Sequence, residues 1–137
     1  MKIGIATEML VFTSCLFATI VIHSFYVQHA IYHHIFLCVT VCSVMRYLTE
    51  NWWVWKADTA MAHVAFLSVC CDWVTPLDRP WVLVFPSAVA LLWMAETVYP
   101  KHADRLHVAL HLVTVAGIHC YLCPLPLPLP LPLPVSE

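Results

Sequence analysis

The chain has very few charged residues and almost no glycine. Only 10% of its 137 residues are Asp, Glu, Lys or Arg, two are glycine, and 62% are hydrophobic. A soluble domain of this size could not cover so much apolar surface, so an ordinary globular protein is excluded. The formal net charge of −2, with no basic cluster, excludes a nucleic-acid partner. Composition therefore predicts an all-α, polytopic transmembrane helical bundle whose immediate partner is membrane lipid.

Long apolar runs make up most of the sequence, and charged or turn-forming residues separate them. Five runs are long enough to cross about 30 Å of hydrocarbon at about 1.5 Å per residue. We expect Pro86 to kink the fourth, because proline removes one backbone donor. The predicted transmembrane domain covers residues 1–123, with helices at 3–26, 29–48, 58–75, 80–99 and 106–122.

The distribution of Lys and Arg orients these five crossings. Arg79 falls on one side of the membrane, and the other five basic residues fall on the side of the N-terminus: Lys2, Arg46, Lys56, Lys101 and Arg105. This bias predicts a cytosolic N-terminus and a lumenal or extracellular C-terminus, in an organelle that the sequence does not specify. A four-crossing alternative merges the first two runs and removes the bias.

The C-terminal tail, residues 124–137, is a low-complexity segment in which leucine alternates with proline. Such a segment cannot be helical, and we expect a polyproline II rod rising about 3.1 Å per residue. A spacer without function and a ligand for an aromatic groove are both open readings.

The pair His107 and His111 is the most informative polar pattern of the chain. Their i, i+4 spacing stacks both imidazoles on one face of a helix, close enough to share a metal ion. Imidazoles inside lipid need a partner, which can be a metal, a carboxylate or water. The alternative is a pair that snorkels to the headgroups or bonds to neighbouring helices.

Other polar side chains are expected at the same depth as this pair. Asp58 is expected to open the third helix, where the helix N-terminus stabilises a carboxylate. Ser43 and Tyr47 lie one turn apart at the end of the second helix. A hydroxyl, a carboxylate and paired imidazoles from three helices suit a zinc-activated water.

Together these residues resemble the CREST superfamily of membrane hydrolases, which includes alkaline ceramidases, adiponectin-receptor-like proteins and myomaker-type proteins. The family pattern is Ser-x-x-x-His, then Asp, then His-x-x-x-His opening the last helix. The resemblance implies a zinc site at His107 and His111 and hydrolysis of lipid amides or esters, with Ser43 and Asp58 as catalytic residues. Two departures are Tyr47, a poor zinc ligand at the place of the first family histidine, and five helices where the family normally has seven.

Three functions are consistent with this pattern. In a zinc-dependent hydrolase, Asp58 would transfer a proton and Ser43 would stabilise the oxyanion. A non-enzymatic scaffold, assembly subunit or pseudoenzyme would use its buried polar residues for helix packing, with a second copy or another membrane protein as partner. A proton or ion pathway would be lined by Glu8, Asp58, Glu96 and histidines.

The remaining histidines are expected to lie apart from the paired site. His29, His33 and His34 fall on the opposite membrane side and are read as an interfacial cluster, with pH sensing or a second metal as alternatives. His63 would complete a three-histidine site only if its helix rotated it inward. Otherwise it is a histidine packed between helices.

Overall fold

The computed structural model describes residues 5–49, 51–74 and 83–123, and within these ranges the chain is helical with short turns and no strand. This confirms the all-α prediction for the described residues. The elements are α1 (Ile5–Cys15), α2 (Phe17–Tyr26), α3 (Ala30–Leu48), α4 (Trp52–Val74), α5 (Val84–Val98), the short 3-10 helix η2 (Pro100–His102) and α6 (Ala103–Leu122).

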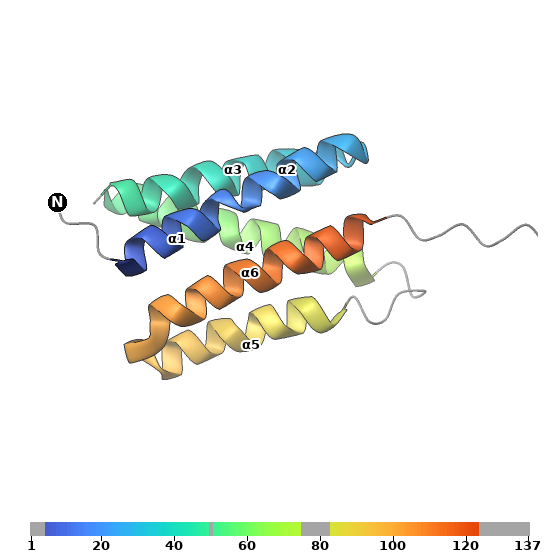
Figure 1. The fold of residues 1–137 in the computed structure, drawn as a ribbon. Coiled ribbons are helices and arrows are strands. Elements are labelled where there is room, and N and C mark those ends of the chain that lie inside the picture. The colour runs from blue at the N-terminus through green and yellow to red at the C-terminus, as the bar shows by residue number, and fades with distance from the viewer. Residues whose placement is uncertain (1–4, 50, 75–82, 124–137) are drawn as a thin grey trace, which may run out of the picture.

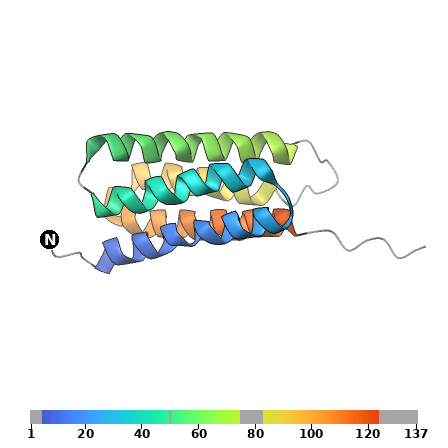
Figure 2. The same ribbon diagram turned by 90° about the horizontal axis from the view of Figure 1, so that it is seen from above.

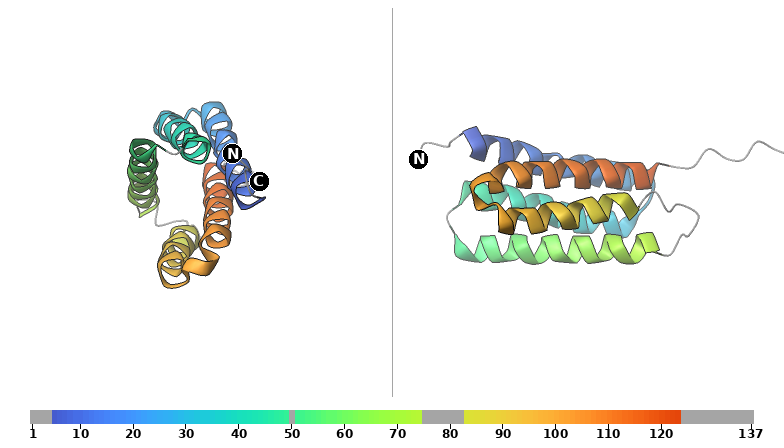
Figure 3. Two further views of the ribbon diagram at one scale, coloured as in Figure 1. Left: turned by 90° about the vertical axis from the view of Figure 1, so that its left-hand side faces the viewer. Right: turned by 90° about the horizontal axis from the view of Figure 1, so that it is seen from below.

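The helices run alongside one another in alternating directions, with α1 and α2 joined end to end as one rod (Figures 1 and 2). The start of α1 lies at the same end of the bundle as the end of α3, the start of α4, the end of α5 and the start of α6. We call this the N-terminal end of the bundle and the opposite one the far end. Viewed end-on, the helices are arranged in a ring, with α5 packed on α6 and α3 packed on both α2 and α4 (Figure 3). Among the α-helix pairs that pack on each other, α4 and α5 have the smallest contact.

The junction between α1 and α2 has a local cause in the sequence. The hydroxyls of Thr13 and Ser14 donate to the carbonyl of Leu10, and that of Thr19 donates to the carbonyl of Leu16. Side chains that bond to the preceding turn in this way compete with the helical ladder and bend it. The predicted first helix is therefore continuous as a rod but broken at Leu16.

Three stretches are long and apolar enough to cross a membrane: Thr7–Tyr26, Ala30–Leu48 and Pro100–Leu122. They indicate a membrane protein, as composition predicts. Of the other two predicted crossings, α5 is apolar but has only 15 residues in the described range. Helix α4 has 23 residues and carries Lys56, Asp58 and Asp72.

Two local expectations are wrong. Helix α4 begins at Trp52, so Asp58 lies in its second turn and not at its N-terminus. The backbone N–H of Trp53 donates to the side chain of Asn51 at 2.8 Å, so Asn51 caps this helix. Pro86 is the third residue of α5, in a first turn whose N–H groups have no partner within the helix, so it causes no kink there. The Leu-Pro tail lies outside the described residues.

Candidate functional site

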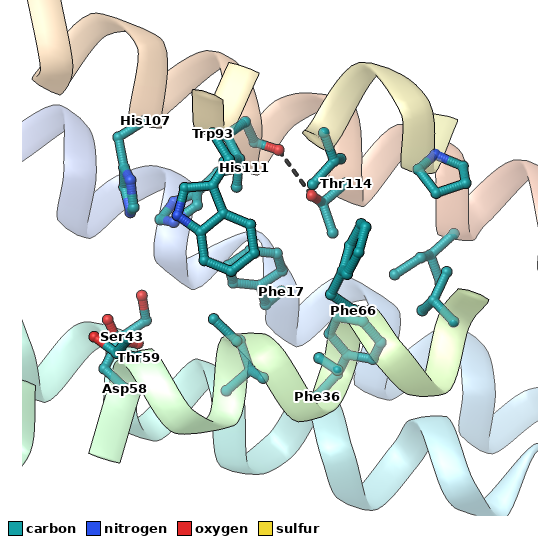
Figure 4. Close-up of a pocket in the computed structure, with 18 of the residues that line it drawn as sticks. Phe17, Phe36, Ser43, Asp58, Thr59, Phe66, Trp93, His107, His111 and Thr114 are labelled. Carbon is teal, nitrogen blue, oxygen red and sulfur yellow. Dashed lines mark hydrogen bonds between the residues drawn. The ribbon is translucent and has the colours of Figure 1, made fainter. Parts of the chain in front are cut away.

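A cavity of about 270 Å³ lies between the helices, near the lower limit of about 300 Å³ typical of small-molecule sites. In Figure 4, Ser43, Asp58 and Thr59 lie on one wall and His107 and His111 on the opposite one. The polar lining gathers toward the N-terminal end of the bundle, and the rest is mainly apolar. The polar group is Ser43, Arg46, Asp58, Thr59, Glu96, His107 and His111, and the remainder includes Phe36, Val69, Phe85, Val89 and Ile118 together with Thr114.

His107 is oriented by a carboxylate on the neighbouring helix. Its Nδ1–H donates to Oε1 of Glu96 on α5, at 2.9 Å. A carboxylate only accepts hydrogen bonds, so Nδ1 carries the proton. In a neutral imidazole this leaves the lone pair on Nε2.

His111 is oriented in the same sense by a hydroxyl of α1. The Oγ1 of Thr13 lies 3.1 Å from Nδ1 of His111, and its hydrogen is directed to the carbonyl of Leu10. With the Thr13 hydrogen on Leu10, Nδ1–H of His111 donates to Thr13 and Nε2 keeps the lone pair, whereas the other tautomer of His111 reverses both roles. His111 is only 4% exposed, and its ring lies edge-on to that of Phe17.

The structure thus brings His107 and His111 together, with ring centroids 4.6 Å apart and both Nδ1 atoms engaged. Histidines that ligate metals commonly donate the other ring N–H to a carboxylate or similar acceptor in this way. However, the described part of the chain contains no group of three or more His, Cys, Asp or Glu side chains arranged to hold a metal ion. The pair alone supplies fewer ligands than the three protein ligands of a catalytic zinc.

Asp58 is stabilised by an ion pair. The carboxylate is buried and accepts a hydrogen bond from Nη1 of Arg46 at 2.8 Å. The guanidinium lies beside the rings of Tyr47 and Trp55, at 5.4 and 5.9 Å from their centroids. The counter-charge of Arg46 therefore replaces the helix N-terminus that the sequence suggested as the stabilising feature of Asp58.

Ser43 is buried and its hydroxyl hydrogen is committed. Its Oγ lies 3.2 Å from Oγ of Ser14, whose own hydrogen is donated to the carbonyl of Leu10. Ser43 must then donate to Ser14. Oxyanion stabilisation by Ser43 would require this hydroxyl to rotate, whereas its free lone pairs can accept a hydrogen bond from the cavity.

The other polar candidates differ in whether they line the cavity. Glu96 lines the cavity, whereas Glu8 is exposed near the start of α1. His63 is exposed, donates to the carbonyl of Thr59 at 2.7 Å and packs on Trp93, with ring centroids 4.6 Å apart. It is not part of the cavity lining and so does not complete a three-histidine site.

The partners in α1 could not be found from short motifs. Thr13 and Ser14 are buried and orient His111 and Ser43, which lie 98 and 29 residues away in the sequence. Their only local signal is a pair of adjacent hydroxyls within an apolar run, which occurs in many membrane helices for packing alone. Comparison of the chain with family models, curated proteins and solved structures gives no match.

Proposed function

We propose that this chain is a multi-pass integral membrane protein that binds a lipid in its central cavity. The observation that carries the proposal is the division of one cavity into a polar N-terminal end and an apolar remainder. A lipid with a polar head and a hydrocarbon tail has the same division. In the five-crossing topology, the cytosolic N-terminus puts the polar end at the cytosolic leaflet.

The hydrogen-bonding groups at the polar end of the cavity determine which lipid head group can bind there. With Nδ1 of both rings and the hydroxyl hydrogen of Ser43 already bonded, Nε2 of His107, Nε2 of His111 and the lone pairs of Ser43 are the acceptors left for a ligand. The charges of Arg46 and Asp58 offset each other. A matching head is therefore a neutral or cationic hydrogen-bond donor, such as a hydroxyl, an amide N–H or an amine, and an anionic head is disfavoured.

Photo-crosslinking tests this proposal. The purified full-length chain in lipid nanodiscs is mixed with a diazirine-bearing fatty-acyl ethanolamide, illuminated and mapped by mass spectrometry. We expect labels on residues that line the cavity, and competition by unlabelled ethanolamide but not by the corresponding fatty acid.

Two substitutions on the same helix provide the matched control. Ala65 is buried and lines the cavity, whereas Ala60 is exposed on α4. Ala65→Phe should reduce labelling about tenfold, equivalent to about 1.4 kcal/mol of binding free energy. Ala60→Phe should leave it unchanged. Equal labelling of both variants would refute binding in the cavity.

A zinc-dependent hydrolase of lipid amides or esters is the second candidate. The observation that favours it is the orientation of His107 and His111. Nδ1 of each ring is held by a hydrogen bond, which leaves the lone pair on Nε2 for a metal. Zinc bound there would activate a water, with Asp58 and Ser43 as the neighbouring catalytic groups. The described residues supply two histidines where catalytic zinc needs three protein ligands, so the donor set does not fit a complete site.

Elemental analysis separates the two candidates. A binding protein should contain far less than one zinc per chain and should not change on His107→Ala or His111→Ala. A hydrolase should contain about one zinc per chain and lose it in both variants. Tyr47→His restores the residue type of the resembled family pattern, and a gain of zinc in this variant alone would indicate a hydrolase site that has lost its third ligand.

A further inference from the structure

Two histidines bind each other at the far end of the bundle, away from the cavity. The rings of His23 of α2 and His119 of α6 lie nearly parallel and edge to edge, with centroids 5.0 Å apart and an interplanar angle of 18°. Their Nδ1 atoms lie 2.7 Å apart, which is the distance of a hydrogen bond. Neither residue is part of the cavity lining. The contact therefore links two helices from opposite ends of the sequence.

The neighbouring hydrogen bonds fix the protons of this pair. The hydroxyl of Thr19 donates its only hydrogen to the carbonyl of Leu16, at 2.6 Å. Nε2–H of His119 must then donate to Oγ1 of Thr19, at 2.8 Å. A neutral imidazole carries a single N–H, so Nδ1 of His119 is the acceptor and Nδ1–H of His23 is the donor.

This arrangement tolerates one added proton and not two. The first proton can enter at Nε2 of His23, where it leaves the Nδ1–H donor in place and makes the hydrogen bond charge-assisted. A second proton can enter only at Nδ1 of His119, where it removes the acceptor. Two positive rings then lie in contact and repel each other. Imidazole is the side chain whose ordinary charge change falls between about pH 5 and 8.

The ionisable groups of α3 do not compensate for this repulsion. His33 is bonded through Nδ1 to the carbonyl of Val21 at 3.1 Å. His34 is bonded to the carbonyl of Ala30, within its own helix, at 2.7 Å. Both are bases, so acidification adds positive charge at this end.

The other neighbouring elements supply one carboxylate, and it has its own partners. Oδ2 of Asp72 on α4 lies 3.3 Å from Nε2 of His29 and accepts a hydrogen bond from Tyr121 of α6 at 3.0 Å. In the described ranges, Asp72 is the only carboxylate at the far end. The described start of α5 carries no ionisable group, and the end of α6 adds the exposed thiols of Cys120 and Cys123. Among the described residues, no hydrogen bond or ion pair joins a carboxylate to either of the two rings.

We propose that His23 and His119 form an acid-sensitive clasp between α2 and α6. The clasp is closed when both rings are neutral or when one of them is charged, and it opens when both rings are charged. Opening lets the far ends of α2 and α6 separate while the N-terminal end keeps its own contacts. In the proposed topology the far end faces the lumen or the cell exterior, so the clasp would respond to the pH of that compartment.

The distance between the two helix ends provides the test. Nitroxides are attached through genetically encoded amino acids at Tyr26 and Cys123, both exposed at the far end, in the full-length chain in nanodiscs. Pulsed electron paramagnetic resonance is recorded at about pH 8, 6.5 and 4.5. We expect one distance population at the two higher values and, at the lowest, a population longer by at least about 1–2 Å, the scale of helix shifts in switching proteins.

His119→Gln is the matched variant. The glutamine amide can accept from His23 and donate to Thr19, but it cannot take up a proton. We expect the short distance at every pH in this variant, and the same loss of response in His23→Gln if the first variant folds poorly. His34→Gln should respond like the wild type. An unchanged distance in the wild type between pH 8 and 4.5, or a full response in both clasp variants, would overturn the proposal.

Discussion

Arg46 of α3 donates a hydrogen bond to Asp58 of α4 at 2.8 Å, at the polar end of the cavity. The side chain of Asp58 is 6% exposed and that of Arg46 is 26% exposed, so the carboxylate is shielded from solvent more than the guanidinium is. Each charge is the other's partner, and removal of one leaves the other unbalanced in a poorly solvated place. The pair therefore joins α3 to α4 as well as setting the charge of the cavity.

Asp58→Asn should destabilise the protein by about 1–3 kcal/mol, below the 3–5 kcal/mol of a fully buried pair because Arg46 retains some solvent. The measurement is the free energy of unfolding in mixed micelles. Asp104→Asn, an exposed acid in the first turn of α6, is the control and should cost less than about 1 kcal/mol. Arg46→Gln combined with Asp58→Asn should recover part of the loss, because neither charge is then left alone. Equal effects of the two single Asp variants would contradict the role of the ion pair.

Gly117→Ala should destabilise the contact between α5 and α6. A Cβ at Gly117 would lie 2.7 Å from both Cβ and Cγ of Phe85, at the base of that side chain, so α5 itself would have to move. Overpacking of this kind costs about 1–3 kcal/mol, against a gain of about 1 kcal/mol in helix propensity. We expect a net fall in the thermal midpoint, little change for the neighbouring exposed Ala116→Val, and a smaller effect of Gly117→Ala in a Phe85→Ala background, which removes Cγ and Cδ1 of that side chain. A higher midpoint for Gly117→Ala would show that the helices are not this close.

The positions of the helices could be predicted because apolar runs and their breaks depend on local sequence. The helix predicted at 58–75 lacks the first six residues of α4, because charged and turn-forming residues before Asp58 interrupt the apolar run. Asn51 carried the missing signal, since a side-chain acceptor before an aromatic run can cap a helix. Trp52, Trp53 and Trp55 are 41–73% exposed, as expected for interfacial residues within a helix rather than a loop.

The candidate site was predictable only in part. The sequence gives the one-face spacing of His107 and His111, and the antiparallel order of the helices gives their common end with Ser43 and Asp58. It does not give the protonated nitrogen of each ring, because Glu96 and Thr13 decide it and come from other helices. Nor does it give the side of α4 that His63 occupies, because the contact with Trp93 depends on how α4 and α5 are placed.

Gln28→Gly should stabilise the protein. Gln28 has a φ of 58°, in the left-handed region, and follows the end of α2. The N–H of His29 bonds to the carbonyl of Ser24, and that of Gln28 to the carbonyl of Phe25, as in a Schellman motif, where glycine is the preferred residue. Removal of the side chain should raise the free energy of unfolding by about 1 kcal/mol. Gln28→Ala retains a Cβ and is the control, with an expected change in stability of less than about 0.5 kcal/mol. A loss of stability in Gln28→Gly would contradict the left-handed conformation of this turn.

Trp93→Ala should speed the exit of bound lipid. Helices α4 and α5 contact each other least among the packed pairs, and Trp93 of α5 bridges them through His63 and Phe66, with ring centroids 4.6 and 6.1 Å away. Each aromatic contact is worth about 0.5–1.5 kcal/mol, so loss of both should raise the dissociation rate of a fluorescent acyl ethanolamide about 5- to 140-fold. Trp53→Ala removes an exposed indole at the start of α4 and is the control. If both variants release the lipid at the wild-type rate, lipid does not pass between α4 and α5. The entry route must then lie elsewhere around the bundle, even if the lipid still binds in the cavity.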